Sequence, residues 1–121
     1  MIIGINHVQI TIPEGNEGEA KKFYCEFLGL KEIEKPKELR LNGGFWMQIG
    51  SIQVHVGIEN GIDRKKNKTH IAYEVHGIEL WKIKLCKKNI AIEIPRKIQG
   101  YNRLEFRDPF GNRVEFIERE S

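Results

Sequence analysis

The chain repeats one order of sequence patterns twice, with a period of about sixty residues. Each half reads as a strand, then a helix, then three more strands. Such a period is too long for a solenoid repeat and is typical of two fused copies of one module. We therefore expect one domain over residues 1–121, with module 1 at about 1–58, a polar linker at about 59–68 and module 2 at about 69–118.

In the first half, alternating apolar and polar residues predict a strand over residues 2–12, with His7 on its polar face. Asn16, followed three residues later by Glu19, resembles a capping box that starts a helix. Apolar residues at helical spacing carry this helix to the stop at Gly29. The later strands of this half are predicted at residues 31–34, 45–49 and 52–58.

The last two of these strands form a predicted hairpin around Gly50-Ser51, a dipeptide that suits a type II′ turn. This turn sets a register in which Trp46 lies opposite His55 and Gln48 lies opposite Gln53. The four side chains then share one face of the sheet. In the second half, strands are predicted at residues 69–75, 90–94, 101–107 and 113–117, and a helix at 78–88.

Four residues of metal-ligand type lie opposite the apolar faces of their strands: His7, His55, His70 and Glu115. His7 and His70 are 63 residues apart, and His55 and Glu115 are 60 residues apart, so the two halves supply equivalent positions. A single histidine on a polar strand face is usually solvated or hydrogen-bonded. Because these four recur at repeat-related positions, they indicate a site for a divalent transition metal.

Charge and hydropathy exclude several classes of protein. The chain has 20 basic and 17 acidic residues, an excess too small and scattered for nucleic-acid binding. No apolar run reaches the roughly 18 residues that a membrane span needs, and the N-terminus lacks the layout of a signal peptide. The two cysteines form no CxxC motif, which favours a reducing cytoplasm.

Four segments match the sequence of a known group of proteins: NHVQI at 6–10, FYCEFLGL at 23–30, THIAYEV at 69–75 and RDPFGNRVEFIE at 107–118. With these segments the chain resembles the vicinal oxygen chelate superfamily, the glyoxalase, bleomycin-resistance and extradiol-dioxygenase group. The resemblance implies an α+β fold in which two βαβββ modules form an open, cup-shaped mixed sheet with helices on the outside. It also implies that His7, His55, His70 and Glu115 bind the metal, because ligands in this superfamily come from the first and last strands of each module.

The resemblance implies a divalent metal cofactor (zinc, nickel, manganese or iron) and an enzyme of lyase or isomerase type that acts on a small oxygen-chelating compound. Glu115 would also transfer a proton, as the equivalent carboxylate does in glyoxalase I, although that enzyme carries a glutamate where this chain has His55. Fosfomycin-modifying thiol transferases share three of the ligands, and a fourth at His55 would crowd the drug. Metal-free bleomycin-resistance proteins and dioxygenases are further alternatives.

Further residues of the same faces are expected to bind the substrate. Trp46, Gln48 and Gln53 share the face of His55, whereas Tyr101, Arg103 and Glu105 share the face of Glu115 if the alternation holds. Trp46 and Tyr101 would form an apolar wall and Arg103 would meet a substrate anion. The resemblance also implies a homodimer, and whether each metal takes its ligands from one chain or from two remains open.

Overall fold

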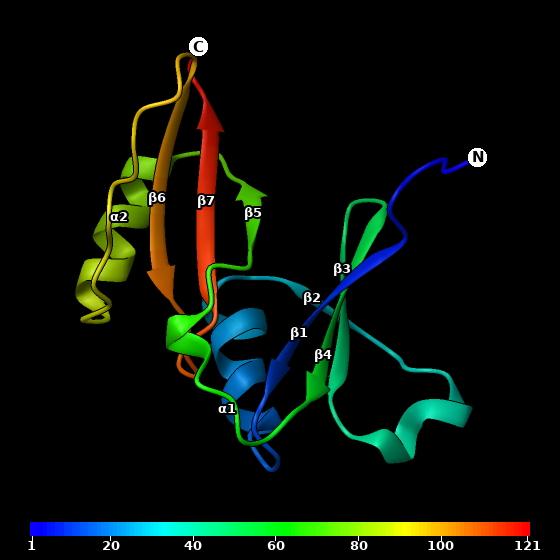
Figure 1. Ribbon diagram of the computed structural model, residues 1–121. Helices are drawn as coiled ribbons and strands as arrows, with labels where there is room; N and C mark the ends of the chain where they lie inside the picture. The colour runs from blue at the N-terminus through cyan, green and yellow to red at the C-terminus, as the bar shows by residue number, and fades with distance from the viewer. The chain divides into compact units, whose positions relative to one another are not determined.

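The computed structural model describes residues 1–121 and divides into two compact units, Met1–Ile62 (unit 1) and Asp63–Ser121 (unit 2) (Figure 1). The boundary falls within the predicted linker at 59–68. Unit 1 contains a sheet of four strands and unit 2 a sheet of three, each with parallel and antiparallel pairs. The predicted α+β class with two related modules is confirmed.

Unit 1 contains a sheet in the order β1-β4-β3-β2, in which β1 runs parallel to β4 and the other pairs are antiparallel. The two hairpin strands pair Trp46 with His55 and Gln48 with Gln53, as the turn at Gly50-Ser51 predicted. In chain order the elements are β1 (His7–Ile12), α1 (Glu17–Lys21), the π-helix η1 (Lys22–Phe27), β2 (Lys31–Ile33), the 3₁₀ helix η2 (Lys37–Asn42), β3 (Phe45–Ile49) and β4 (Ile52–Ile58).

The first strand is shorter than predicted, because it begins at His7 and not at Ile2. Its parallel partner β4 begins at Ile52, and the register pairs His7 with Gln53. Residues 1–5 therefore have no β4 residue to pair with, and Ile2 and Ile3 are almost fully exposed. Alternation alone does not show where the partner strand ends.

The first helix also differs from its prediction. Asn16 does not cap the backbone, because its φ and ψ of −104° and 14° lie outside the extended cap conformation, and its amide donates instead to Glu19 Oε2 (3.2 Å). After Lys21 the helix widens into η1, where Leu28 N donates to Phe23 O (2.9 Å), five residues back. Tyr24, at the middle of η1, is buried in the core.

Unit 2 contains a sheet in the order β5-β7-β6, with β5 parallel and β6 antiparallel to β7. Its helix lies beside this sheet (Figure 1), and the rings of Trp81 and Phe116 meet at 5.1 Å between centroids. The elements are the 3₁₀ helix η3 (Arg64–Lys66), β5 (His70–Glu74), α2 (Ile78–Lys87), β6 (Tyr101–Arg107) and β7 (Arg113–Arg119).

The strand predicted at residues 90–94 is wrong, because only one bridge forms, between Glu93 and Glu105. Asn89 before it has a positive φ of 59°, and Pro95 after it has no N–H to donate to a ladder. Ile94 is exposed. The apolar residues of this segment therefore predicted a strand, but the residues at its two ends prevent a strand from extending.

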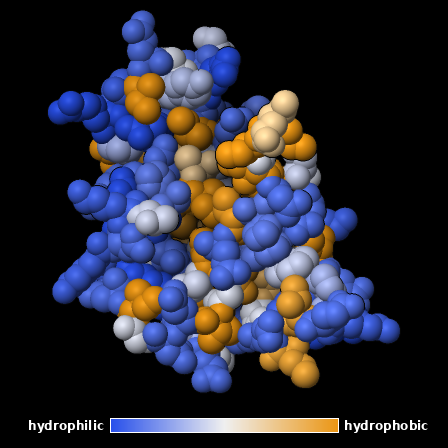
Figure 2. Space-filling model, turned by 45° about the vertical axis from the view of Figure 1, so that its right-hand side comes forward, coloured by the Kyte–Doolittle hydropathy of each residue, from blue (hydrophilic) through white to orange (hydrophobic).

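No helix in the structure could cross a membrane. The longest, α2, has 10 residues and is about 15 Å long, half of a bilayer core of roughly 30 Å. Hydrophilic residues cover most of the molecular face drawn in Figure 2, in keeping with a chain in which 31% of the residues are charged.

Candidate metal centre

Three aromatic rings stack on one face of unit 1. They come from three adjacent strands: Trp46 from β3, His55 from β4 and His7 from β1. The ring centroids of Trp46 and His55 are 3.8 Å apart at an interplanar angle of 3°, and those of His55 and His7 are 4.1 Å apart at 13°. His55, in the middle, is 7% exposed. Strand register therefore brings together both predicted ligands of unit 1.

Amide oxygens select which nitrogens of these two histidines carry a proton. His7 Nδ1 lies 2.9 Å from Asn6 Oδ1, and His55 Nε2 lies 2.9 Å from Gln53 Oε1. Because an amide oxygen only accepts, the bonded nitrogen carries the proton, which leaves lone pairs on His7 Nε2 and His55 Nδ1. Burial, followed by the charges of His7 and Lys35, lowers the pKa of His55 and favours the neutral form that binds metals.

A cavity of about 470 Å³ opens over this stack. Its wall includes His7, Trp46 and His55, together with Lys35 and the backbone around Gly43. The ammonium of Lys35 donates to Gly43 O (2.6 Å) and so closes one side of the cavity. The arrangement gives unit 1 a flat aromatic surface beside two imidazoles.

In unit 2, His70 and Glu115 lie on adjacent parallel strands and contact each other directly. His70 Nε2 is 3.1 Å from Glu115 Oε1, and His70 Nδ1 is 2.9 Å from the carbonyl oxygen of Lys68. The carbonyl oxygen accepts from Nδ1, and Nε2 is the nitrogen that faces Glu115. Glu115 is 4% exposed. Ligand atoms of His70, Glu105 and Glu115 all lie within 4.8 Å of one another.

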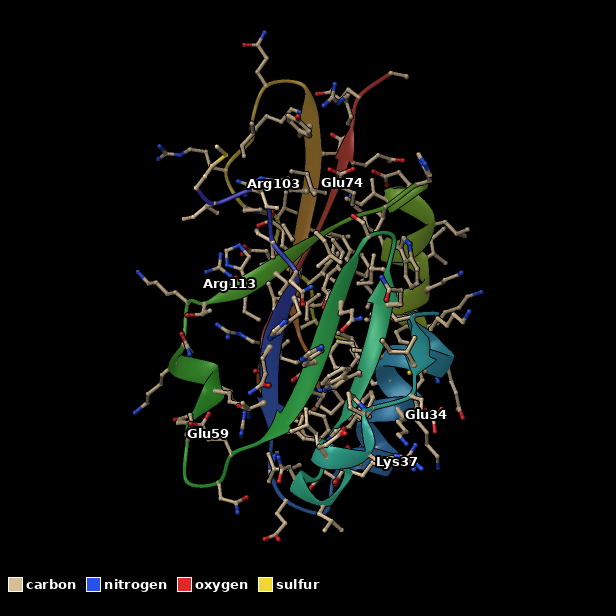
Figure 3. All side chains as sticks on the ribbon, turned by 90° about the vertical axis from the view of Figure 1, so that its right-hand side faces the viewer. Glu34, Lys37, Glu59, Glu74, Arg103 and Arg113 are labelled. Atoms are coloured by element: carbon tan, nitrogen blue, oxygen red, sulfur yellow. The ribbon has the colours of Figure 1, made fainter.

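Two arginines neutralise the carboxylates of this group. Arg103 Nη1 is 3.5 Å from Glu115 Oε2, and Arg113 pairs with Glu105 through both Nε (3.0 Å) and Nη2. Figure 3 labels the arginines, which come from the neighbouring strands β6 and β7. Arg103 Nε is buried and has no hydrogen-bond partner. A buried donor without an acceptor is uncommon and suits an anionic ligand.

The other predicted substrate-binding residues lie in different surroundings. Gln53 holds His55, as described above, whereas the Gln48 amide donates to Gly50 O (2.8 Å) and Ile52 O (3.3 Å) and so supports the hairpin turn. Tyr101 lies in a separate cavity of about 270 Å³ that neither His70 nor Glu115 lines, and its hydroxyl accepts from Arg119.

One member of the unit 2 group, Glu105, was not predicted as a ligand. The signal for it is in the sequence, because the alternation that selects Glu115 also places Glu105 on the same face. The antiparallel register pairs these two residues directly. Without the register, Glu105 could not be told from an ordinary polar residue of a strand surface.

Two related modules, with His7, His55, His70 and Glu115 on their first and last strands, agree with the resemblance to the vicinal oxygen chelate superfamily. In agreement with this, residues 4–116 match the family described as Glyoxalase/Bleomycin resistance protein/Dioxygenase superfamily. The chain belongs to this superfamily, as its four sequence segments indicated. No curated protein matches the chain significantly.

Solved structures agree with this assignment, the first by its sequence and the other two by their fold alone. A glyoxalase family protein from Bacillus anthracis is 39% identical, with a TM-score of 0.89 and coverage of 99% of this chain and 98% of that chain. An integron cassette protein from the mobile metagenome of a Halifax Harbour sewage outfall is 22% identical (TM-score 0.74, coverage 97% and 99%). The fosfomycin resistance protein FosX from Listeria monocytogenes, complexed with Mn(II) and sulfate, is 14% identical (TM-score 0.77, coverage 99% and 93%) and supports the fold alone.

Proposed function

We propose that the protein is a metal-dependent enzyme of the lyase or isomerase type that acts on a small oxygen-chelating compound. The observation that carries this proposal is the orientation of the histidines. His7 and His70 each direct Nδ1 at an oxygen acceptor, at 2.9 Å in both cases. In known metal sites, a hydrogen bond from the ring nitrogen that does not bind the metal fixes the tautomer and the orientation of the histidine.

The residues suit a divalent ion held by His7, His55, His70 and Glu115. Three neutral imidazoles and one carboxylate are a donor set for zinc, nickel, manganese or iron. When bound, such an ion acts as a Lewis acid on substrate oxygens. FosX, which shares the fold, has been crystallised with Mn(II). Four protein ligands leave two positions on a six-coordinate ion and none on a tetrahedral one, so the proposal requires a six-coordinate ion.

The remaining residues of the proposed site bind and orient the substrate. Trp46 offers a flat surface for stacking, and Gln53 keeps the His55 ring in place. Arg103 offers its unpaired Nε–H to an anionic or carbonyl oxygen of the substrate. Gln48 supports the hairpin turn, and Tyr101 lies in its separate cavity, so neither is given a direct contact with the substrate. Glu115 would move the proton at Oε2, the oxygen next to Arg103.

The test of this proposal is the metal content of protein purified without metal-affinity steps, together with metal titrations of the wild type. About one ion per site and a rise in melting temperature with manganese, nickel, zinc or iron(II) are expected. The variants His70→Ala and Glu115→Gln should lose both. Substoichiometric metal in the wild type, with no thermal gain from any of the four ions, would refute the proposal.

A metal-free binding protein is the second candidate, and the aromatic stack over the unit 1 cavity favours it. That function needs Trp46 but not the ligands. Small-molecule binding that survives His7→Ala and Glu115→Ala would therefore support the second candidate, whereas binding that disappears with the metal would remove it. A fosfomycin-modifying activity, suggested by the fold shared with FosX, is tested by assaying consumption of the drug with and without a thiol.

The proposed site can be assembled within one chain or across a homodimer. In the shared arrangement, His7 and His55 come from one chain and His70 and Glu115 from its partner. Mixing His7→Ala chains with Glu115→Ala chains distinguishes the two, because only the shared arrangement restores one intact site in each mixed dimer. A monomer in sedimentation at micromolar concentration would exclude the shared arrangement.

A further inference from the structure

Glu105 is a buried carboxylate to which the proposed function gives no role. It is 6% exposed and lies directly opposite Glu115, which is 4% exposed, across the antiparallel pair β6–β7. Like charges at directly opposite positions of a sheet repel each other, and burial strengthens the repulsion. A buried pair of this kind is stable only when cations lie close to it.

The cations in this structure are arginines, and they contact the carboxylates diagonally. Arg113 lies on the same strand as Glu115 but pairs with Glu105, while Arg103 lies on the same strand as Glu105 but pairs with Glu115. The two carboxylates and two guanidinium groups cancel in charge. His70 lies beside them and contacts Glu115 through Nε2.

We propose that Glu105 is a third metal ligand supplied by unit 2, and that Arg113 holds its carboxylate when no ion is bound. This inference rests on the proposed function. The ligand atoms of His70, Glu105 and Glu115 lie within 4.8 Å, and bonds of about 2.1 Å place ligand atoms at most about 4.2 Å apart. A small rotation of the Glu105 side chain is therefore sufficient to complete a three-ligand group within one unit.

Space for this rotation exists. Glu105 and Arg113 line a cavity of about 550 Å³ whose wall also includes Lys68, Glu93 and Arg107. Arg107 is held by three backbone carbonyl oxygens, of Arg64, Asn67 and Gly111, so it does not compete for Glu105. The carboxylate can thus exchange between Arg113 and the ion without leaving a buried charge unpaired.

The additional carboxylate has two consequences. Two carboxylates and imidazoles shift the metal preference toward manganese or iron(II), since hard oxygen ligands favour these ions. With His7 and His55, Glu105 would be a fifth protein ligand and would leave one position on a six-coordinate ion. A ligand that chelates through two oxygens needs two positions, so its binding would return Glu105 to Arg113.

The experiment measures Mn(II) affinity by the electron paramagnetic resonance signal of the free ion. It compares the full-length wild type with Glu105→Gln, Glu105→Asp and the control Glu93→Gln, which changes an exposed carboxylate of the same cavity. We expect both Glu105 variants to bind Mn(II) at least about 10-fold more weakly and the control to match the wild type. Glu105→Asp keeps the charge but shortens the side chain, so its loss identifies ligation and not charge.

Oxalate, a two-oxygen chelator, provides the second measurement. On Mn(II)-loaded protein, both Glu105 variants should bind oxalate more tightly than the wild type, because no carboxylate must be displaced. Mn(II) affinity of Glu105→Asp within twofold of the wild type would overturn the inference, whether or not Glu105→Gln is weaker. If the wild type binds Mn(II), and His70→Ala abolishes binding while Glu105 variants bind normally, only this inference fails. If the wild type binds no metal, the proposed function fails as well.

Discussion

Units 1 and 2 share a parallel strand pair and an antiparallel hairpin, but they carry different side chains on the face of the proposed site. The registers make His7 equivalent to His70 and His55 equivalent to Glu115. Around these positions unit 1 has Trp46 and Gln53, where unit 2 has Glu105 and Arg113.

Unit 1 therefore surrounds its proposed ligands with rings and amides that stack and fix tautomers. Unit 2 surrounds its proposed ligands with charges that cancel in pairs. Two related modules can thus keep residues of ligand type at equivalent positions while one provides a flat apolar surface and the other provides charge.

The opposite faces of the two sheets differ as well. In unit 1 the buried residues of the hairpin are mainly aliphatic or flexible, such as Met47, Val54 and Val56. In unit 2 a group of rings packs around Phe116, with centroids of Phe106 and Trp81 both at 5.1 Å and Tyr73 at 6.3 Å. The buried face of the hairpin thus holds the rings of Phe106 and Phe116 in unit 2, where that of unit 1 holds Phe45.

The largest effect is expected where the copies differ in backbone conformation. Gly44 of unit 1, equivalent to Arg103 of unit 2, has a φ of +78°, and a Cβ there would lie 2.0 Å from the carbonyl oxygen of Val56. Gly44→Ala should cost about 4–5 kcal/mol of unfolding free energy, because both the conformation and the contact are forbidden. Arg103→Ala should cost about 1–2 kcal/mol. Chemical denaturation measures both, and equal losses would contradict the backbone difference between the two positions.

The second prediction compares the two cores at equivalent positions. Phe116→Ala removes the ring that contacts three others and should cost about 3–4 kcal/mol. Val56→Ala at the matching position of unit 1 removes two methyl groups and should cost about 2 kcal/mol. Denaturation with urea gives both values. A loss in Val56→Ala as large as that in Phe116→Ala would mean that the aliphatic core of unit 1 is equally sensitive.

The period-two patterns predicted most of this comparison from the sequence, because a strand face is decided by local alternation. Alternation placed His7, His55, His70 and Glu115 on their polar faces, and one two-residue turn gave the pairing of Trp46 with His55. The role of the four residues as ligands stays a prediction. The strand expected at residues 90–94 failed because its two ends do not allow it to extend, whereas the early start at Ile2 failed because β4 offers no partner there. A strand exists only where a partner offers backbone groups, and partners lie far away in the sequence.

The role of Glu105 was unpredictable for a related reason. A glutamate on a polar strand face is ordinary, and it becomes a candidate ligand only when it lies opposite Glu115 and within reach of His70. The apolar spacing also did not reveal the π-helix after Lys21, because a single widened turn changes that spacing only slightly.

The third prediction concerns a carboxylate that binds backbone N–H groups in each unit. Hydrogen bonds from Ile78 N (3.1 Å) and Gly77 N (2.7 Å), at the start of α2, lower the pKa of Glu118. When the pKa of a carboxyl group is lower in the folded state, the group stabilises the protein at pH values above its unfolded pKa of about 4.3. This stabilisation is lost as the pH falls through the folded pKa. Glu118→Gln should therefore lower the melting temperature at pH 7 but hardly at pH 3.

The matched variant in unit 1 is Glu17→Gln. Glu17 accepts from Gly44 N (3.1 Å), and this bond is the main reason that its pKa is also lowered. We expect the same pH dependence, because backbone N–H groups, that of Gly44 first, stabilise the charged form of Glu17 as well. Melting curves from pH 3 to pH 7 test both, and a Glu118→Gln difference that is independent of pH would exclude the carboxylate as its cause.

The smallest effect distinguishes the units by fluorescence, because each contains one of the two tryptophans of the chain. Trp46 stacks on His55, so a paramagnetic ion such as Ni(II) bound by His55 should quench its emission in the Trp81→Phe variant. Trp81 packs against Phe116, whose side chain lies on the face opposite Glu115. Emission of Trp81 in the Trp46→Phe variant should therefore change less on the same titration.

Adding His55→Ala to Trp81→Phe provides the control and should remove the quenching. Equal quenching of both tryptophans would show that the ion is not held next to the aromatic stack of unit 1, and the division of roles between the two units would then be wrong.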